Sequence, residues 1–325
     1  MINKRYANDG KPSLKINSVQ QNQLEIIKTR IMEGAYEFAK FACPICGEAD
    51  SDKLSSKDRY GLYAPIVICK NCGLIRADPC MTEDSYIHFY KHVYRQLYVG
   101  VKAPDNAYFE KAERAGAVTC NFLSNHMSVA GKRVLDVGCG SGALLKCLQN
   151  KGASVKGIDL GEEYLVYAIE RYGIDLTNTD LFNLPNNHEF DLIIYSDVLE
   201  HIKNPISHLE KIKGLLSPRG TLYIKVPSTK NIMRPYLGDF LKSIQNAHVC
   251  YYSLATLRSL VEGCGYHMDV GNEKIRSLWS VSKETPKQIV NDYAPAMDYI
   301  RSLEKKKLLR VFLPVAYKII KELKI

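Results

Sequence analysis

The chain has 325 residues, with 46% hydrophobic and 24% charged residues, which excludes a disordered or collagen-like protein. No apolar run approaches the ~18 residues of a membrane-spanning helix, and none follows the charged amino-terminal residues. We therefore expect a cytoplasmic protein without a signal peptide or membrane anchor. The net charge is +9, and residues 301–325 alone hold eight basic and two acidic residues. The remainder is nearly neutral, which argues against a uniformly basic nucleic-acid-binding face.

Residues 1–42 are expected to form an amino-terminal helical arm, with the polar positions 1–18 frayed and a helical pattern from position 19. Two C-x-x-C-G units follow, and their cysteines are Cys43, Cys46, Cys69 and Cys72. Each two-residue gap lets one tight turn present two thiolates, so the two pairs predict a tetrahedral site for a structural Zn²⁺. Because four sulfur ligands leave no position for water, the metal would stabilise a zinc-ribbon module over 43–80 and would not take part in a reaction.

An α/β pattern follows this module. The stretch 81–130 combines aromatic residues with a helical pattern, and we interpret it as a linker or lid. From 131 to 285 strand and helix patterns alternate, which predicts a Rossmann-like, doubly wound sheet with helices on both faces. A polar break at 228–247 is where a substrate loop is expected. The predicted strands are 133–137, 154–158, 174–179, 190–196 and 222–226, and the predicted helices are 107–126, 143–150, 162–172, 205–216 and 253–263.

A glycine-rich turn joins the first of these strands to its helix. It contains Asp136, Gly138, Gly140 and Gly142. Glycines allow a tight turn and a close approach by a ligand, and the helix amino terminus behind them suits an anion. Asp159 ends the next strand, 21 positions after Gly138, where an acid can accept hydrogen bonds from both ribose hydroxyls. These residues predict an adenosine-type ligand, and Gly138, Gly140 and Ala143 alone would also permit NAD.

Five motifs in order resemble those of class I S-adenosylmethionine-dependent methyltransferases, the group that includes ubiquinone-biosynthesis and many bacterial small-molecule and sugar methyltransferases. The resemblance covers residues 132 to about 270. The first motif is LDVGCGSG at 135–142 and the second is GID at 157–159. The others are DLFNLP at 180–185, FDLIIYSDVLEHI at 190–202 and LSPRGTLYIKVP at 216–227.

The resemblance implies a set of cofactor contacts. S-adenosylmethionine carries no diphosphate, so the glycine turn would receive the methionine carboxylate, Asp136 would orient the amino-acid end, and Asp159 would hold the ribose. Asp180 would meet the adenine amino group. The matching motif positions also place Leu160, Leu181 and Ser196 among the cofactor-binding residues.

Methyl transfer from a sulfonium mainly needs an aligned acceptor and, for a hydroxyl, a base that removes its proton. His201 and His248 are the candidates, because histidine titrates near neutral pH. The alternatives are that His201 braces the turn after its strand and that His248 packs under the last helix. Asp197 either faces the acceptor or caps the following turn.

The predicted function is O-methylation of a small polar acceptor, on family resemblance a sugar, nucleotide-sugar or surface-glycan precursor in polysaccharide biosynthesis. The zinc module also resembles that of deoxysugar C-methyltransferases, whose further carboxy-terminal domain this chain is expected to lack. An RNA methyltransferase is an alternative, but five basic and five acidic residues balance over 43–80, unlike a phosphate-binding surface. A non-catalytic binding protein and an NAD enzyme are further alternatives.

The residues 286–325 are predicted to form a basic amphipathic helical tail. Its apolar residues recur at helical spacing, and Pro314 is expected to kink the helix or divide it. Such a helix can dock on its own domain or across a dimer, or lie on the anionic inner surface of a membrane. The apolar residues are Leu308, Phe312, Val315, Ile319 and Leu323.

Overall fold

The computed structural model describes residues 1–283 and 288–322, apart from the side chains of Glu163 and of residues 308–322. Its main element is a seven-stranded sheet in the order β12-β13-β10-β9-β6-β7-β8. β13 is antiparallel to both its neighbours, and the remaining pairs are parallel. The strands are β6 (Arg133–Val137), β7 (Ser154–Asp159), β8 (Leu176–Asn178), β9 (Phe190–Ser196), β10 (Leu216–Lys225), β12 (Tyr266–Gly271) and β13 (Arg276–Val281).

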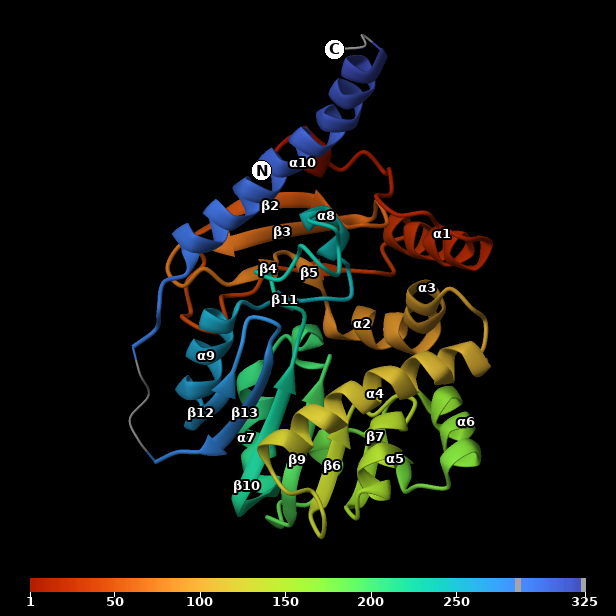
Figure 1. Cartoon of the computed structure of the whole chain (residues 1–325), viewed down its shortest axis with the longest axis vertical. Helices are drawn as coiled ribbons and strands as arrows, with labels where there is room; N and C mark the ends of the chain where they lie inside the picture. Colours follow the sequence, from red (N-terminus) through yellow and green to blue (C-terminus); the bar gives the residue numbers. More distant parts are fainter. Residues whose placement is uncertain (284–287, 323–325) are drawn as a thin grey trace.

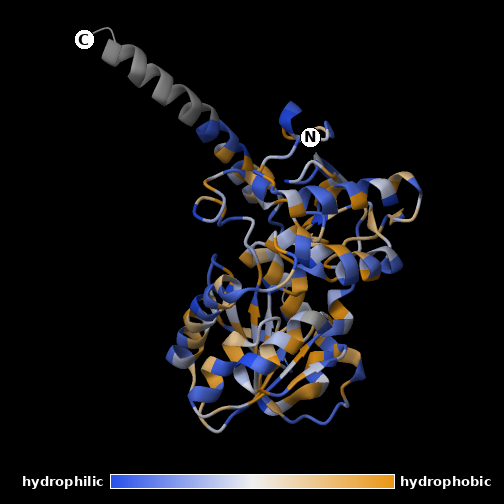
Figure 2. Cartoon of the chain, turned by 90° about the vertical axis from the view of Figure 1, so that its right-hand side faces the viewer, coloured by the Kyte–Doolittle hydropathy of each residue, from blue (hydrophilic) through white to orange (hydrophobic). Residues whose placement is uncertain are grey.

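Helices cover both faces of this sheet, as the sequence predicted (Figure 1). The strand order reverses between β6 and β9, so right-handed crossovers place α5 and α6 on one face and α7 and α9 on the other. Figure 2 shows hydrophobic strands inside these more polar helices. The helices are α4 (Asn106–His126), which packs on α5, α5 (Ala143–Asn150), α6 (Glu162–Tyr172), α7 (Pro205–Leu215) and α9 (Leu254–Gly263), with 3-10 helices η3 (Leu181–Asn183) and η4 (Leu199–His201).

A second, four-stranded antiparallel sheet contains the cysteine pairs, and its order is β11-β4-β3-β2. Its fourth strand, β11, comes from the methyltransferase-like part of the chain. One hydrophobic core continues from this sheet into the large one. The predicted 43–80 module is therefore not structurally separate, which differs from the sequence expectation. The strands are β2 (Ser51–Lys57), β3 (Tyr63–Cys69), β4 (Ile75–Ala77) and β11 (Cys250–Tyr251), while β1 (Phe38–Ala39) pairs with β5 (Cys80–Met81).

The segment 228–247, expected as an open substrate loop, is mostly packed against the small sheet. It includes the short helix α8 (Phe240–Ser243), and Ile232, Phe240 and Ile244 are almost fully buried. The sequence suggested a loop because polar residues, proline and glycine interrupt the pattern, yet the apolar residues among them belong to the hydrophobic core that both sheets share. Its last residues, from Gln245, border a cavity.

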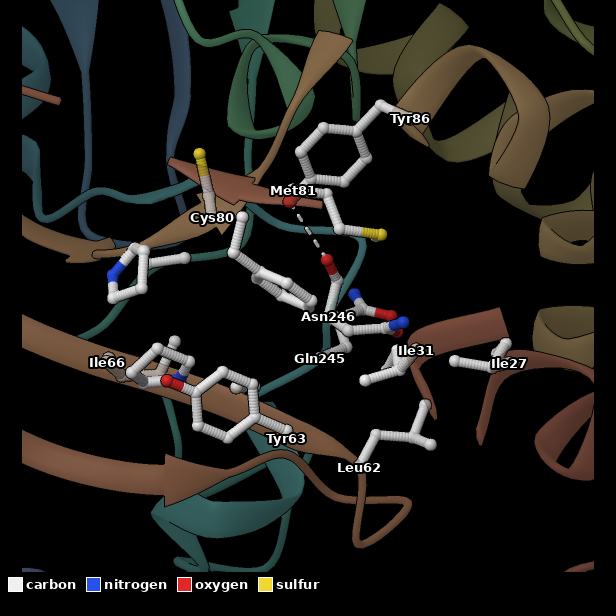
Figure 3. A pocket seen from close by; sticks show the side chains of 15 residues that line it. Ile27, Ile31, Leu62, Tyr63, Ile66, Cys80, Met81, Tyr86, Gln245 and Asn246 are labelled. Atoms are coloured by element: carbon white, nitrogen blue, oxygen red, sulfur yellow. Dashed lines mark hydrogen bonds between the residues drawn. The ribbon is translucent and has the colours of Figure 1, made fainter. Parts of the chain in front are cut away.

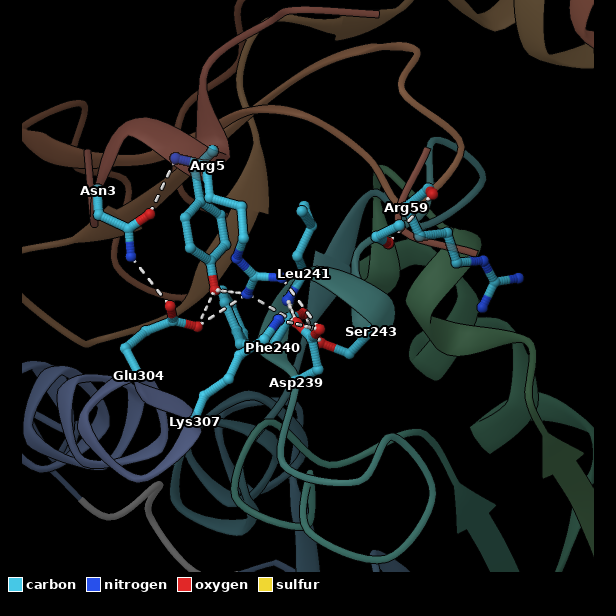
Figure 4. A network of polar contacts seen from close by, with 11 residues as sticks. Asn3, Arg5, Arg59, Asp239, Phe240, Leu241, Ser243, Glu304 and Lys307 are labelled. Atoms are coloured by element: carbon cyan, nitrogen blue, oxygen red, sulfur yellow. Dashed lines mark hydrogen bonds and ion pairs between the residues drawn. The ribbon is translucent and has the colours of Figure 1, made fainter. Parts of the chain in front are cut away.

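The amino-terminal arm is ordered, so the expectation that it frays is wrong. Tyr6, in the 3-10 helix η1 (Lys4–Tyr6), is fully buried and donates its hydroxyl to Glu304, at 2.5 Å. Arg5 pairs with Asp239 at 2.7 Å and with Glu304 at 2.9 Å (Figure 4). The arm also holds α1 (Ser18–Met32). Ion pairs between residues far apart in sequence fix the arm, and no local pattern reveals them.

The lid predicted over 81–130 begins with three helical pieces, which lie over the carboxyl edge of the large sheet (Figure 1). These are α2 (Glu83–Phe89), one π-helical turn η2 (Tyr90–Tyr94) and α3 (Arg95–Val99). A π turn inside a helix is unusual and often marks a functional site. We refer to residues 83–99 as the lid segment.

The tail forms α10 (Tyr293–Glu322). Its start docks on the second cysteine pair, where the Asp292 amide donates to the Cys72 carbonyl at 3.1 Å. The predicted amphipathic pattern from Leu308, with Pro314, lies outside the residues whose side chains are described. No helix in the described part of the chain is long and apolar enough to cross a membrane.

Candidate active site

The glycine turn lies at the point where the strand order reverses, which is the usual ligand crevice of such sheets. Gly138, Gly140 and Gly142 have φ values of 76°, 52° and 68°. A Cβ on Gly138 would lie 2.5 Å from Val198 Cγ2, just beyond β9. A side chain here would therefore be strained and would also clash, which explains the sequence requirement for glycine.

Asp159, at the end of β7, is joined directly to the glycine turn. Its carboxylate accepts from the amide of Gly140 at 2.8 Å and from that of Gly161 at 2.7 Å. Arg95 of the lid segment places Nη2 3.4 Å from both carboxylate oxygens. The structure thus brings the turn, the predicted ribose acid and the lid segment together, and the sequence reasoning did not find Arg95.

Asp136 lies beneath this turn with only 5% of its surface exposed. Burial raises the pKa of its carboxyl well above the usual value, and the negative charges of Asp159 and Asp197 raise it further. Its carboxylate forms no hydrogen bond with the described residues. Asp136, Asp159 and Asp197 bring three acidic groups close together, and the Asp136 carboxylate has no hydrogen-bond donor among the described residues. Such a site favours a ligand that carries positive charge, as an ammonium or a sulfonium does.

The remaining predicted cofactor residues belong to the loops at the same edge of the sheet. Asp180 caps η3 by accepting from the Phe182 amide at 2.7 Å, and Leu181 is buried. Leu160 is 70% exposed beside Asp159. Ser196 ends β9 and donates to Asp197 at 3.4 Å. No contact among Asp180, Leu160 and Ser196 joins them in the described structure, so their cofactor role stays a prediction.

His201 and His248 lie side by side, with ring centroids 4.9 Å apart. His201 Nδ1 is 2.9 Å from the Ala247 carbonyl oxygen and 2.9 Å from the Tyr90 hydroxyl. Burial lowers the pKa of His201 to about 4, so its imidazole is neutral at pH 7. Burial also lowers the pKa of His248 well below its usual range. The ligand atoms of Glu200, His201 and His248 all lie within 4.8 Å of one another.

An aromatic-walled cavity lies beside these histidines, because Tyr94 and Ala247 of its lining both contact His201. It has no space for a water molecule in this structure. The lid segment and the Gln245–Ala247 loop form its walls, together with one residue of the small sheet. A separate apolar hollow between α1 and β3 lies on the other side of Gln245 and Asn246 (Figure 3), and no residue of the glycine turn lines it. The aromatic-walled cavity is lined by Tyr60, Phe89, Tyr94, Leu97, Tyr98, Gln245, Asn246 and Ala247.

The four predicted metal ligands are brought together. The sulfur atoms of Cys43, Cys46, Cys69 and Cys72 all lie within 4.8 Å of one another, and all four cysteines are free of disulfides. Two sulfur pairs are 3.4 and 3.5 Å apart. Tetrahedral Zn–S bonds of about 2.3 Å require sulfur atoms about 3.8 Å apart. The arrangement therefore fits a four-thiolate zinc site.

Comparisons with known proteins agree with the fold and the motifs. A family model described as a methyltransferase domain matches residues 108–269. A ubiquinone biosynthesis O-methyltransferase from Actinobacillus pleuropneumoniae serotype 5b is 38% identical over 171 residues, covering 44% of this chain and 73% of that protein. One from Stutzerimonas stutzeri is 29% identical over 122 residues, covering 35% of this chain and 53% of that protein. The chain spans about half the length of several relatives of that name.

Solved methyltransferase structures are similar to part of this chain. Magnesium protoporphyrin IX methyltransferase from Synechocystis PCC 6803, with bound SAH, is 18% identical with a TM-score of 0.45, covering 61% of this chain and 98% of that one. A Burkholderia thailandensis 1,6-didemethyltoxoflavin-N1-methyltransferase is 15% identical with a TM-score of 0.47, covering 71% and 97%.

The glycine turn at the strand reversal and the matched methyltransferase domain are those of the S-adenosylmethionine-dependent methyltransferase class. More particularly, the chain belongs to the class I family of these enzymes, as its five motifs predicted.

Proposed function

We propose that this methyltransferase methylates a hydroxyl group of a small polar acceptor, of the sugar, nucleotide-sugar or surface-glycan-precursor class. The proposal rests on the hydrogen-bond partners of His201. The Ala247 carbonyl beside Nδ1 favours a proton on that nitrogen, which leaves the lone pair on Nε2 free to accept one. A neutral histidine in η4, just after β9, can receive the proton of a hydroxyl.

The reaction is an in-line displacement. A lone pair of the acceptor oxygen forms the new C–O bond as the methyl–sulfur bond breaks, and the bonding pair leaves with the sulfur of S-adenosylhomocysteine. The hydroxyl proton passes to His201 Nε2. Because the sulfonium already activates the methyl group, the protein's contribution is alignment and proton removal.

The cofactor is proposed to use the acids at the glycine turn. Asp159 would accept from the ribose hydroxyls, Asp136 would pair with the ammonium, and the amides of the turn would meet the carboxylate. Arg95 now lies against the Asp159 carboxylate. Cofactor binding is therefore expected to displace Arg95 and with it the lid segment.

The acceptor is proposed to enter the aromatic-walled cavity. Tyrosine faces and the amides of Gln245 and Asn246 suit a ring that carries hydroxyl groups. A phenol is the second candidate, because the relatives are named as O-methyltransferases of ubiquinone biosynthesis. The cavity has no space for a water molecule in this structure, whereas ligand pockets usually measure roughly 300 Å³ or more. The lid segment must therefore move before an acceptor binds.

Cys43, Cys46, Cys69 and Cys72 are proposed to hold a structural zinc ion. The metal would close the two cysteine turns and stabilise β2, β3 and β4. It supplies no step of the methyl transfer, because its four ligands leave no open coordination position.

Transfer of an isotope-labelled methyl group tests this function. The purified chain would be incubated with labelled S-adenosylmethionine and with sugars, nucleotide sugars or phenols. We expect labelled product from at least one hydroxyl acceptor, with the label released by ether cleavage. Label attached only to nitrogen or carbon, or label found only in added RNA, would contradict O-methylation of a small acceptor.

A further inference from the structure

Arg59 lies in the turn between β2 and β3 and is buried, with 8% of its surface exposed. Its Nη2 donates to the Tyr60 hydroxyl at 3.0 Å and to Gln245 Oε1 at 2.8 Å. Both acceptors are neutral. The Nε atom is buried and has no hydrogen-bond partner among the described residues, so this guanidinium uses only part of its five-donor capacity there.

No acidic side chain in the described part of the chain forms an ion pair with Arg59. The carboxylate of the neighbouring Asp58 already accepts hydrogen bonds from three backbone amides. Its Oδ1 accepts from the amides of Tyr60 and Leu62, and its Oδ2 accepts from the amide of Asn246. Arg59 is instead placed over two aromatic rings, 4.9 Å from the centroid of Tyr60 and 5.7 Å from that of Tyr98. These contacts offset only part of the burial of a positive charge.

Among the described residues, buried Arg76 provides a contrast. Its Nε also has no partner, but its Nη2 forms an ion pair with Asp78 at 3.1 Å. Buried charges in proteins are normally paired in this way. A buried arginine without an anion is therefore expected where a ligand brings the anion, and the planar guanidinium matches a carboxylate or a phosphate with two parallel hydrogen bonds.

Arg59 also borders the proposed acceptor cavity. Three residues that it touches, Tyr60, Tyr98 and Gln245, line that cavity. Figure 4 shows the Arg59 side chain directed away from the network of Arg5, Asp239 and Glu304. The charge is therefore not committed to the ion pairs that hold the amino-terminal arm, and it lies directly behind three lining residues of the cavity.

We infer that Arg59 binds an oxyanion, a carboxylate or a phosphate, on the methyl acceptor. The acceptor is then an anionic molecule, held at one end by the small sheet while its hydroxyl lies at His201 on the large sheet. This inference rests on the proposed function, since it places the acceptor in the aromatic-walled cavity. It narrows the acceptor class to phosphorylated or carboxylated compounds.

Calorimetric titration of the S-adenosylhomocysteine-saturated full chain tests this inference. The probes are inorganic pyrophosphate, glucuronate and glucose, which represent a phosphate, a carboxylate and a neutral sugar. We expect one of the two anions to bind and glucose not to bind. Arg59→Met should weaken anion binding about tenfold or more, Arg59→Lys should weaken it less, and Arg114→Met, a change on the exposed face of α4, should leave it unchanged.

A second variant covers the case in which Arg59→Met fails to fold. Gln245→Glu places a permanent carboxylate against the guanidinium, so it should raise the melting temperature and weaken anion binding about tenfold or more. Unchanged anion binding in Gln245→Glu or in a folded Arg59→Met variant would overturn the inference, as would wild-type protein that binds neither anion. Absence of S-adenosylhomocysteine binding in the same titration would instead count against the proposed function, and the anions would then be titrated into the cofactor-free chain.

Discussion

Gly47 and Gly73 occupy equivalent left-handed positions after the two cysteine pairs, with φ values of 76° and 78°, and they form a matched pair for substitution. A Cβ on Gly47 would meet no atom within 4 Å, whereas one on Gly73 would lie 2.4 Å from the Asp292 backbone. Gly47→Ala should therefore cost only the backbone strain, about 1 kcal/mol in the free energy of unfolding. Gly73→Ala should cost about 3 kcal/mol or more, because backbone must move. Equal costs in denaturant unfolding would show that α10 does not dock on Gly73.

His201 should determine the acid limb of the pH profile. Burial lowers its pKa to about 4, so the imidazole stays neutral and able to accept a proton down to roughly pH 5. We expect kcat/KM to fall only below that pH, and His201→Ala to lower kcat by about 10²–10⁴-fold. His126→Ala, on the exposed end of α4, is the control. An acid limb near pH 6.5 that His201→Ala leaves in place would assign the base elsewhere.

The lid segment is the element on which cofactor entry depends, because Arg95 at the start of α3 lies against Asp159. Arg95→Met should free the acid and tighten S-adenosylhomocysteine binding about 5- to 30-fold, as expected for loss of a competing, partly buried ion pair. Arg171→Met removes an ion pair to Glu113 on the outer helices and is the matched control. Weaker binding by Arg95→Met would show that Arg95 holds the cofactor and does not compete with it.

At the scale of the whole molecule, one hydrophobic core runs continuously between the two sheets. Removing the zinc ion should therefore reduce both the stability of the fold and the rate of methyl transfer. Cys46→Ser should remove bound zinc, lower the melting temperature by about 5 °C or more and reduce methyl transfer. Cys264→Ser changes another half-buried cysteine, one that is not part of the four-cysteine cluster, and should change neither zinc content nor activity. Full activity in zinc-free protein would show that the small sheet folds independently of the site.

The sequence correctly predicted the features that depend on residues close together in the chain, such as helix periodicity and the spacing of glycines and cysteines. Helix α6 covers the predicted residues 162–172, and the glycine turn and the four clustered cysteines lie where spacing placed them. The errors concern contacts between distant segments. β11 joins the small sheet, and Tyr6 is buried beside α10. The sequence did not predict the roles of Arg59 and Arg95, because these roles depend on which residues the fold places beside each arginine.

The most direct test of the central claim is calorimetric titration of the full chain with S-adenosylhomocysteine and, separately, with NAD. The account predicts micromolar binding of S-adenosylhomocysteine, about −8 kcal/mol, and none of NAD. Asp159→Ala should abolish that binding, while Asp191→Ala, at the opposite end of the sheet beside Arg133, should preserve it. Preference for NAD, or S-adenosylhomocysteine binding that survives Asp159→Ala, would contradict the assignment of this site.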